Sequence, residues 1–111
     1  MKDDRPYLEH IDEAIRRIIS YSAGEWDEFS RNSMAQDAII RNLEIVGEAV
    51  KHLSAATKAR RPEIPWQQVA GLRDVLIHDY MGVSLRRVWN VVRKDLPELH
   101  KAIQSLLERP E

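Results

Sequence analysis

Seven apolar residues near the end of the chain recur in alternating steps of four and three positions, the spacing of one face of an α-helix. They are Leu85, Trp89, Val92, Leu96, Leu99, Ile103 and Leu106. Such a face is buried by packing against other helices. Ser84 precedes the run as a helix cap, while Pro97 falls inside it. Because an interior proline deletes one backbone hydrogen bond and crowds an earlier carbonyl, we expect one long helix kinked near residues 93–95, or two abutting helices.

Helical spacing predicts three earlier helices: one between Pro6 and Gly24, one over residues 33–56 and one over residues 66–78. Residues 25–30 are too few for a full helix and predict a turn that caps the core. Residues 57–65 hold three basic residues and two prolines, which favours a basic loop, either a phosphate contact or an ordinary solvated loop. No segment alternates with a period of two. The sequence therefore predicts an all-α fold, an up-down bundle of four main helices, in one domain over residues 1–111.

Composition restricts the possible functions. A chain of 111 residues supports one hydrophobic core. Its net charge is −1, from 17 basic and 18 acidic residues, so any contact with nucleic acid must be local. The chain has no cysteine, a charged start and no run of about 20 apolar residues. We therefore expect a cytoplasmic protein that does not enter membranes.

Four chemically active side chains are concentrated in residues 71–80, namely Arg73, Asp74, His78 and Tyr80. On a helix, Asp74 and His78 lie one turn apart, where the carboxylate can orient the imidazole. Arg73 and His78 lie about 140° apart on an ideal helix, so they converge only if the arginine reaches round or the helix loosens near His78.

This set of side chains suits the cleavage of RNA. His78 can move protons near neutral pH, and Arg73 can bind a phosphate and stabilise transition-state charge. RNA carries its own nucleophile, the 2′-hydroxyl, so this chemistry requires no metal. The alternative is that the same residues form ordinary structural hydrogen bonds.

Other residues indicate no further chemistry. Three histidines lack partners at metal-ligand spacing, and we predict no metal site and no cofactor; they are His10, His52 and His100. Three tryptophans with apolar neighbours are interpreted as packing residues rather than as base-stacking residues; they are Trp26, Trp66 and Trp89.

The spacing of Arg73, His78 and Tyr80 is the R-x4-H-x-Y signature of HepT-like ribonuclease toxins of the HEPN superfamily, which this chain resembles. Residues 38–50, the Ile64-Pro65-Trp66 sequence, Val88-Trp89 and Asp95-Leu96-Pro97 are similar to other landmarks of that family. The resemblance covers nearly the whole chain.

The resemblance implies a dimer in which two copies of the Arg73 and His78 motif face a cleft. It also implies a partner, an MntA-like minimal nucleotidyltransferase antitoxin, which uses ATP to attach AMP to the motif tyrosine, here Tyr80. Asp74 departs from the asparagine that is more frequent in the family, and its carboxylate adds a negative charge beside an RNA site. We assign Asn42, within an apolar stripe, together with Arg41 and Glu48, a supporting role around the motif or the dimer seam.

Two functions follow as expectations. The first is a metal-independent RNA endonuclease toxin that is neutralised by modification of Tyr80. The alternative is a non-catalytic helical dimer that binds and regulates a nucleotidyltransferase. The two hypotheses differ in whether RNA is cut.

Overall fold

The computed structural model describes residues 3–72 and 84–108, and all regular structure within these ranges is helical. The all-α prediction is confirmed for this part of the chain. The elements, in chain order, are α1 (Arg5–Tyr21), α2 (Trp26–Arg31), α3 (Ser33–Lys51), α4 (Ala55–Ala59), α5 (Trp66–Ala70), α7 (Leu85–Asn90), the π-helical turn η2 (Val91–Asp95) and α8 (Leu96–Glu108).

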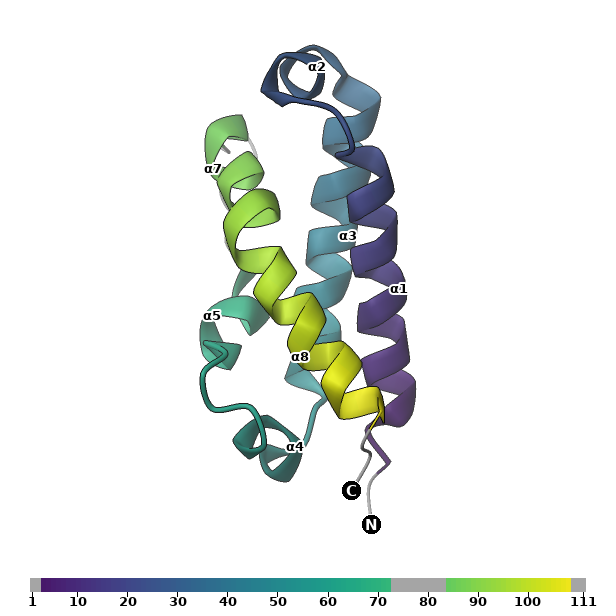
Figure 1. Cartoon of the computed structure of the whole chain (residues 1–111), viewed down its shortest axis with the longest axis vertical. Helices are drawn as coiled ribbons and strands as arrows, with labels where there is room; N and C mark the ends of the chain where they lie inside the picture. Colours follow the sequence, from purple (N-terminus) through teal and green to yellow (C-terminus); the bar gives the residue numbers. More distant parts are fainter. Residues whose placement is uncertain (1–2, 73–83, 109–111) are drawn as a thin grey trace.

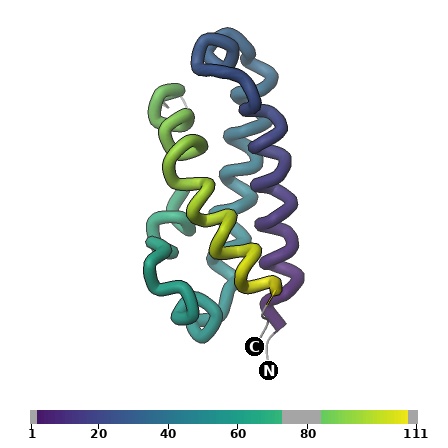
Figure 2. Tube along the Cα trace, viewed as in Figure 1, coloured from purple at the N-terminus to yellow at the C-terminus, as the bar shows by residue number. Residues whose placement is uncertain are grey.

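Three long helical runs make up most of an elongated molecule that measures 45 × 27 × 22 Å. Helices α1 and α3 lie side by side, α8 packs on α1, and α7, η2 and α8 follow one another without a break (Figure 1). The first turn of α1 and the last turn of α8 lie at the same end (Figure 2). The residues that the three runs bury most completely are Ile11, Ile15, Ile18, Ile39, Leu43, Val46, Val50, Ile103 and Leu106. Each contributes about 1.5–3 kcal/mol to folding through its removal from water.

Two predicted boundaries were wrong. Residues 25–30 were expected to form a turn, but most of them belong to the short helix α2, which buries Phe29. The helix predicted to reach residue 56 ends at Lys51. Ser54 explains the early end, because its side chain accepts a hydrogen bond from the backbone N–H of Thr57 and begins a separate helix, α4. Part of the predicted basic loop is therefore helical.

The predicted effect of Pro97 is confirmed. The long run continues through the proline, and the five residues Val91–Asp95 just before it form the π-helical turn η2. A proline cannot donate the hydrogen bond that residue 97 would make, and its ring crowds the carbonyl of Arg93, so the chain widens there. The apolar side chains at Trp89, Val92 and Leu96 all stay buried across the turn.

The fourth predicted helix can be followed only at its start. It begins at Trp66 as predicted, and α5 ends at Ala70, where Gly71 caps it. The predicted continuation to residue 78 lies outside the described residues. The four-helix arrangement and the dimer stay predictions. None of the described helices is long and apolar enough to cross a membrane.

Candidate active site

All four motif residues, Arg73, Asp74, His78 and Tyr80, lie outside the residues that the structure describes. Their predicted roles stay predictions. The structure does describe the helix that enters this segment, α5, and the helix that leaves it, α7. The geometry can therefore be given for the described residues on either side of the motif segment.

The entry to the segment is fixed by Trp66. This buried side chain donates from Nε1 to the carbonyl oxygens of Lys58 at 3.0 Å and Arg61 at 2.9 Å. The guanidinium of Arg61 in turn donates to the hydroxyl of Ser105 on α8. Helix α5 also packs against α3. Arg61 thus has a structural contact in the region that was predicted as a phosphate-binding or solvated loop.

The exit from the segment is held by a helix cap and an aromatic cluster. The hydroxyl of Ser84 accepts a hydrogen bond from the backbone N–H of Arg87 at 3.3 Å, as the sequence predicted. Trp89, also on α7, has its ring centroid 4.8 Å from that of Phe29 and 6.2 Å from that of Trp26. Trp66 and Trp89 are buried, which confirms packing roles for these two, whereas Trp26 is half-buried.

Asn42 is the predicted supporting residue that the structure places in the interior. Its side chain is only 6% exposed, and its Nδ2 donates to the carbonyl of Ala38, one turn earlier on α3, at 2.8 Å. Its Oδ1 has no hydrogen-bond partner within residues 3–72 and 84–108. A buried oxygen without a partner costs about 1–3 kcal/mol. The Oδ1 atom of Asn42 can therefore still accept a hydrogen bond, and it lies on α3, the helix that packs against α5.

Arg41 and Glu48, the other two predicted supporting residues, are exposed on α3. They are seven positions apart, about two turns, and share a face that Asn42 does not share. Glu48 lies 3.9 Å from the ammonium of Lys51 and 3.6 Å from Nε2 of His52. The structure thus separates the buried Asn42 from an exposed Arg41 and Glu48.

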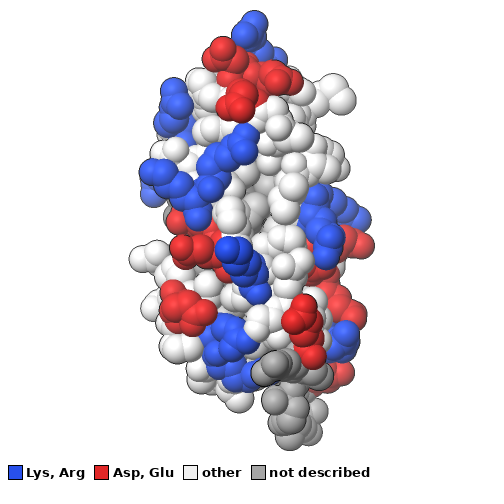
Figure 3. All heavy atoms as spheres, in the orientation of Figure 1, with Lys and Arg blue, Asp and Glu red and all other residues white. Residues whose placement is uncertain are grey.

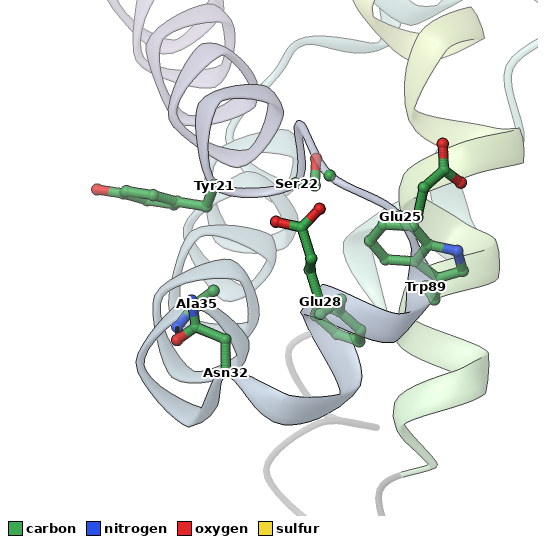
Figure 4. A pocket seen from close by; sticks show the side chains of 9 residues that line it. Tyr21, Ser22, Glu25, Glu28, Asn32, Ala35 and Trp89 are labelled. Carbon is green, nitrogen blue, oxygen red and sulfur yellow. Dashed lines mark hydrogen bonds between the residues drawn. The ribbon is translucent and has the colours of Figure 1, made fainter.

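A pocket lies between α1, α2, α3 and α7, and its lining does not suit RNA. Glu25, Glu28 and Trp89 are among the residues that line this pocket. Figure 4 shows the side chains of Glu25 and Glu28 here, with Trp89 beside Glu25. Two carboxylates repel a phosphate backbone. In the described part of the chain, no three His, Cys, Asp or Glu side chains gather as metal ligands.

Basic side chains on α7 and η2 form a feature that the sequence reasoning missed. Arg86, Arg87, Arg93 and Lys94 are all exposed, and Figure 3 shows Lys and Arg side chains gathered over this part of the molecule. In the sequence they appear as two pairs of cations, Arg86-Arg87 and Arg93-Lys94, seven positions apart. The pairs fall between the apolar residues of the C-terminal 4,3 pattern.

Comparison with known proteins identifies the family. The model of a protein family described as "Ribonuclease HepT-like" matches residues 11–106, nearly the whole chain. The chain belongs to the HepT-like ribonuclease family. The resemblance inferred from the R-x4-H-x-Y signature is confirmed, and the match includes residues 73–80 and extends from within α1 to within α8.

Curated relatives of this HepT-like chain carry ribonuclease names. It is 39% identical over 110 residues to "Putative RNase TTE0752" of Caldanaerobacter subterraneus subsp. tengcongensis, with 98% of each chain covered. It is 40% identical to "Probable ribonuclease HepT" of Thermococcus cleftensis, covering 95% of this chain and 96% of the relative. It is 42% identical to "Gamma-glutamylcyclotransferase and putative RNase MJ0434" of Methanocaldococcus jannaschii, covering 96% of this chain and 49% of the relative. No solved structure matches the HepT-like chain significantly.

Proposed function

We propose that this HepT-like chain is a metal-independent RNA endonuclease and the toxin of a toxin–antitoxin pair. The observation that carries the proposal is the spacing of Arg73, His78 and Tyr80 inside a chain that the HepT-like family matches over residues 11–106. The ribonuclease names of the relatives support the reaction class.

The proposed reaction uses the 2′-hydroxyl of the RNA as nucleophile. His78 accepts the proton of this hydroxyl while the 2′-oxygen attacks the adjacent phosphorus. Arg73 stabilises the charge of the five-coordinate intermediate. The bond from phosphorus to the 5′-oxygen then breaks, and the leaving oxygen takes up a proton. The products are a 2′,3′-cyclic phosphate and a 5′-hydroxyl.

The proposed control of this activity is a covalent modification. An MntA-like nucleotidyltransferase antitoxin transfers AMP from ATP to the phenol oxygen of Tyr80, and pyrophosphate leaves. The added group is bulky and anionic, so it excludes RNA by size and by charge repulsion. The toxin itself then requires no cofactor, because the partner supplies the ATP.

The supporting residues have narrower roles in this proposal. Asp74 orients the imidazole of His78. Asn42 offers the acceptor oxygen that lacks a partner among the described residues. Arg41 and Glu48, both exposed on α3, contribute to the seam of a homodimer.

The decisive experiment measures cleavage of single-stranded RNA by purified protein in the presence of EDTA. We expect cleavage to persist and the new ends to carry 2′,3′-cyclic phosphate. His78→Ala and Arg73→Ala, purified in parallel, should each lower the rate by roughly 10²-fold or more. These variants also control for contaminating ribonuclease.

Two outcomes would overturn the proposal. Cleavage that is lost with EDTA and restored by Mg²⁺ or Mn²⁺ would exclude the mechanism assigned to Arg73 and His78. No cleavage at any protein concentration, together with stable binding of the nucleotidyltransferase, would favour the alternative, a non-catalytic dimer that regulates its partner.

A further inference from the structure

Five exposed polar residues of α7 and η2 are together called the α7 basic surface: Arg86, Arg87, Asn90, Arg93 and Lys94. One exposed acidic residue, Asp95, follows them at the end of η2. The two arginines of α7 are followed by the two cations of η2 after seven positions. Arg86 and Arg93 both lie over rings of the aromatic cluster that holds Trp26 and Trp89. In Figure 3, Lys and Arg side chains gather over this part of the molecule.

The cations of this surface have no carboxylate within ion-pair distance among the described residues. By contrast, three arginines of α1 each pair with an acidic side chain one turn away, at 2.9–3.2 Å; they are Arg5, Arg16 and Arg17. Four cations against one carboxylate, that of Asp95, give α7 and η2 a local positive excess in a chain whose net charge is −1. Neighbouring like charges repel one another, and a bound polyanion removes this repulsion.

Two of the four cations are held in place by aromatic rings. The guanidinium of Arg86 lies 3.9 Å from the ring centroid of Trp26, and that of Arg93 lies 4.3 Å from the ring centroid of Trp89. Arg93 also donates a hydrogen bond to the carbonyl of Gly24. A guanidinium stacked on a ring keeps most of its N–H groups free at its edge, so these two arginines are oriented before any ligand binds.

The composition of the surface fits a phosphate backbone better than a protein. Protein interfaces have apolar centres and, although arginine is frequent in them, few lysines, whereas phosphate and sugar contacts come from Arg, Lys and Asn side chains. The α7 basic surface contains only the latter types. The large apolar side chains that the described residues expose lie instead on α1 and at the start of α3; they are Ile19, Tyr21 and Met34.

We propose that the α7 basic surface binds the phosphate backbone of single-stranded RNA. This inference rests on the proposed ribonuclease function and adds the place where the substrate is held. Ser84, which begins α7, follows Tyr80 by four positions, and four residues of chain span at most about 14 Å. The surface contributes affinity for RNA, while the reaction itself is left to Arg73 and His78.

The test compares two double variants that each remove two positive charges. Arg87→Ala with Lys94→Ala alters the α7 basic surface without touching the aromatic rings. Arg5→Ala with Arg17→Ala is the matched control on exposed parts of α1. The probe is a fluorescent single-stranded oligonucleotide with 2′-O-methyl groups, which cannot be cleaved through the 2′-hydroxyl. Its Kd is measured by fluorescence anisotropy across a series of KCl concentrations, with thermal unfolding as a check on folding.

We expect the surface variant to bind about tenfold more weakly at ~0.1 M KCl, and its salt dependence of log Kd to flatten by about 1.4, for two lost contacts to a single strand. The control should change Kd by less than about twofold and keep the slope. With cleavable RNA, the surface variant should show a raised KM and an unchanged kcat.

The outcomes separate this inference from the proposed function. If the wild type cuts RNA while the surface variant keeps the wild-type Kd and the wild-type salt dependence of log Kd, RNA binding by the α7 basic surface is excluded and the proposed function stands. If the wild type binds the probe through these residues but never cuts RNA, the function is wrong and the surface stands. Equal RNA binding by both, with loss of nucleotidyltransferase binding in the surface variant, would assign the surface to a protein partner and overturn the inference.

Discussion

Asp4 and Ser54 are joined by two hydrogen bonds although they lie fifty positions apart. One carboxylate oxygen of Asp4 accepts the backbone N–H of Ser54 at 2.8 Å and its hydroxyl at 2.7 Å. Asp4 precedes α1 and Ser54 precedes α4, so the contact ties the starts of two helices together. Asp4 is only 7% exposed, and hydrogen bonds to a charged group are worth about 1.5–3 kcal/mol.

The first prediction is that Asp4→Ala destabilises the fold. We expect the free energy of unfolding to fall by about 2 kcal/mol and Tm by ~8 °C, measured by thermal and denaturant unfolding. Asp37→Ala removes the same charge from an exposed side chain of α3 and should cost less than about 0.5 kcal/mol. Equal stabilities of the two variants would show that the tie to Ser54 contributes nothing.

The second prediction separates stability from activity at Asn42. Replacement by leucine, of similar size, removes a buried oxygen that lacks a partner among the described residues. Asn42→Leu should therefore unfold at the same temperature as the wild type or higher. If Asn42 supports the site, RNA cleavage should still fall by roughly tenfold, equivalent to about 1.4 kcal/mol. A variant that is as active as the wild type would remove Asn42 from the site.

The third prediction concerns the modification of Tyr80. After incubation with the nucleotidyltransferase and ATP, the intact mass of the wild type should rise by one or more AMP units of about 329 Da each. Tyr80→Phe keeps the ring and should gain none, while retaining much of its RNA cleavage. In cells this variant should stay toxic in the presence of the partner.

Two results would contradict the role of Tyr80. A Phe variant that still gains AMP would place the acceptor elsewhere, with Tyr7 and Tyr21 as the other tyrosines of the chain. A Phe variant that gains no AMP but has lost RNA cleavage would make Tyr80 part of the catalytic machinery.

The fourth prediction is a homodimer. Multi-angle light scattering at micromolar concentration should give twice the 12.9 kDa mass of one chain. The resemblance to HepT-like proteins, which implies a cleft between two copies of the motif, motivates the expectation. A protein that is strictly monomeric and still cuts RNA would exclude a cleft built from two copies of the motif.

The sequence alone determined the helical class and much of the core. The 4,3 spacing of the long C-terminal run predicted which side chains are buried, and Ser84 and Pro97 predicted its start and its distortion. These features depend on contacts within about one helical turn, so they can be read from neighbouring residues. The motif of Arg73, His78 and Tyr80 could likewise be recognised from its spacing.

Other features depended on the tertiary structure. The break between α3 and α4 is accompanied by the contact from Asp4 to Ser54, and no local pattern predicts a hydrogen bond between residues so far apart. The buried orientation of the Asn42 oxygen depends in the same way on neighbouring helices. The positive charges at Arg87 and Lys94 were visible in the sequence, but the absence of an ion pair to either side chain among the described residues was not. Distances between charges on different elements are set only when the helices pack, because electrostatic interactions depend on spatial separation rather than on position in the chain.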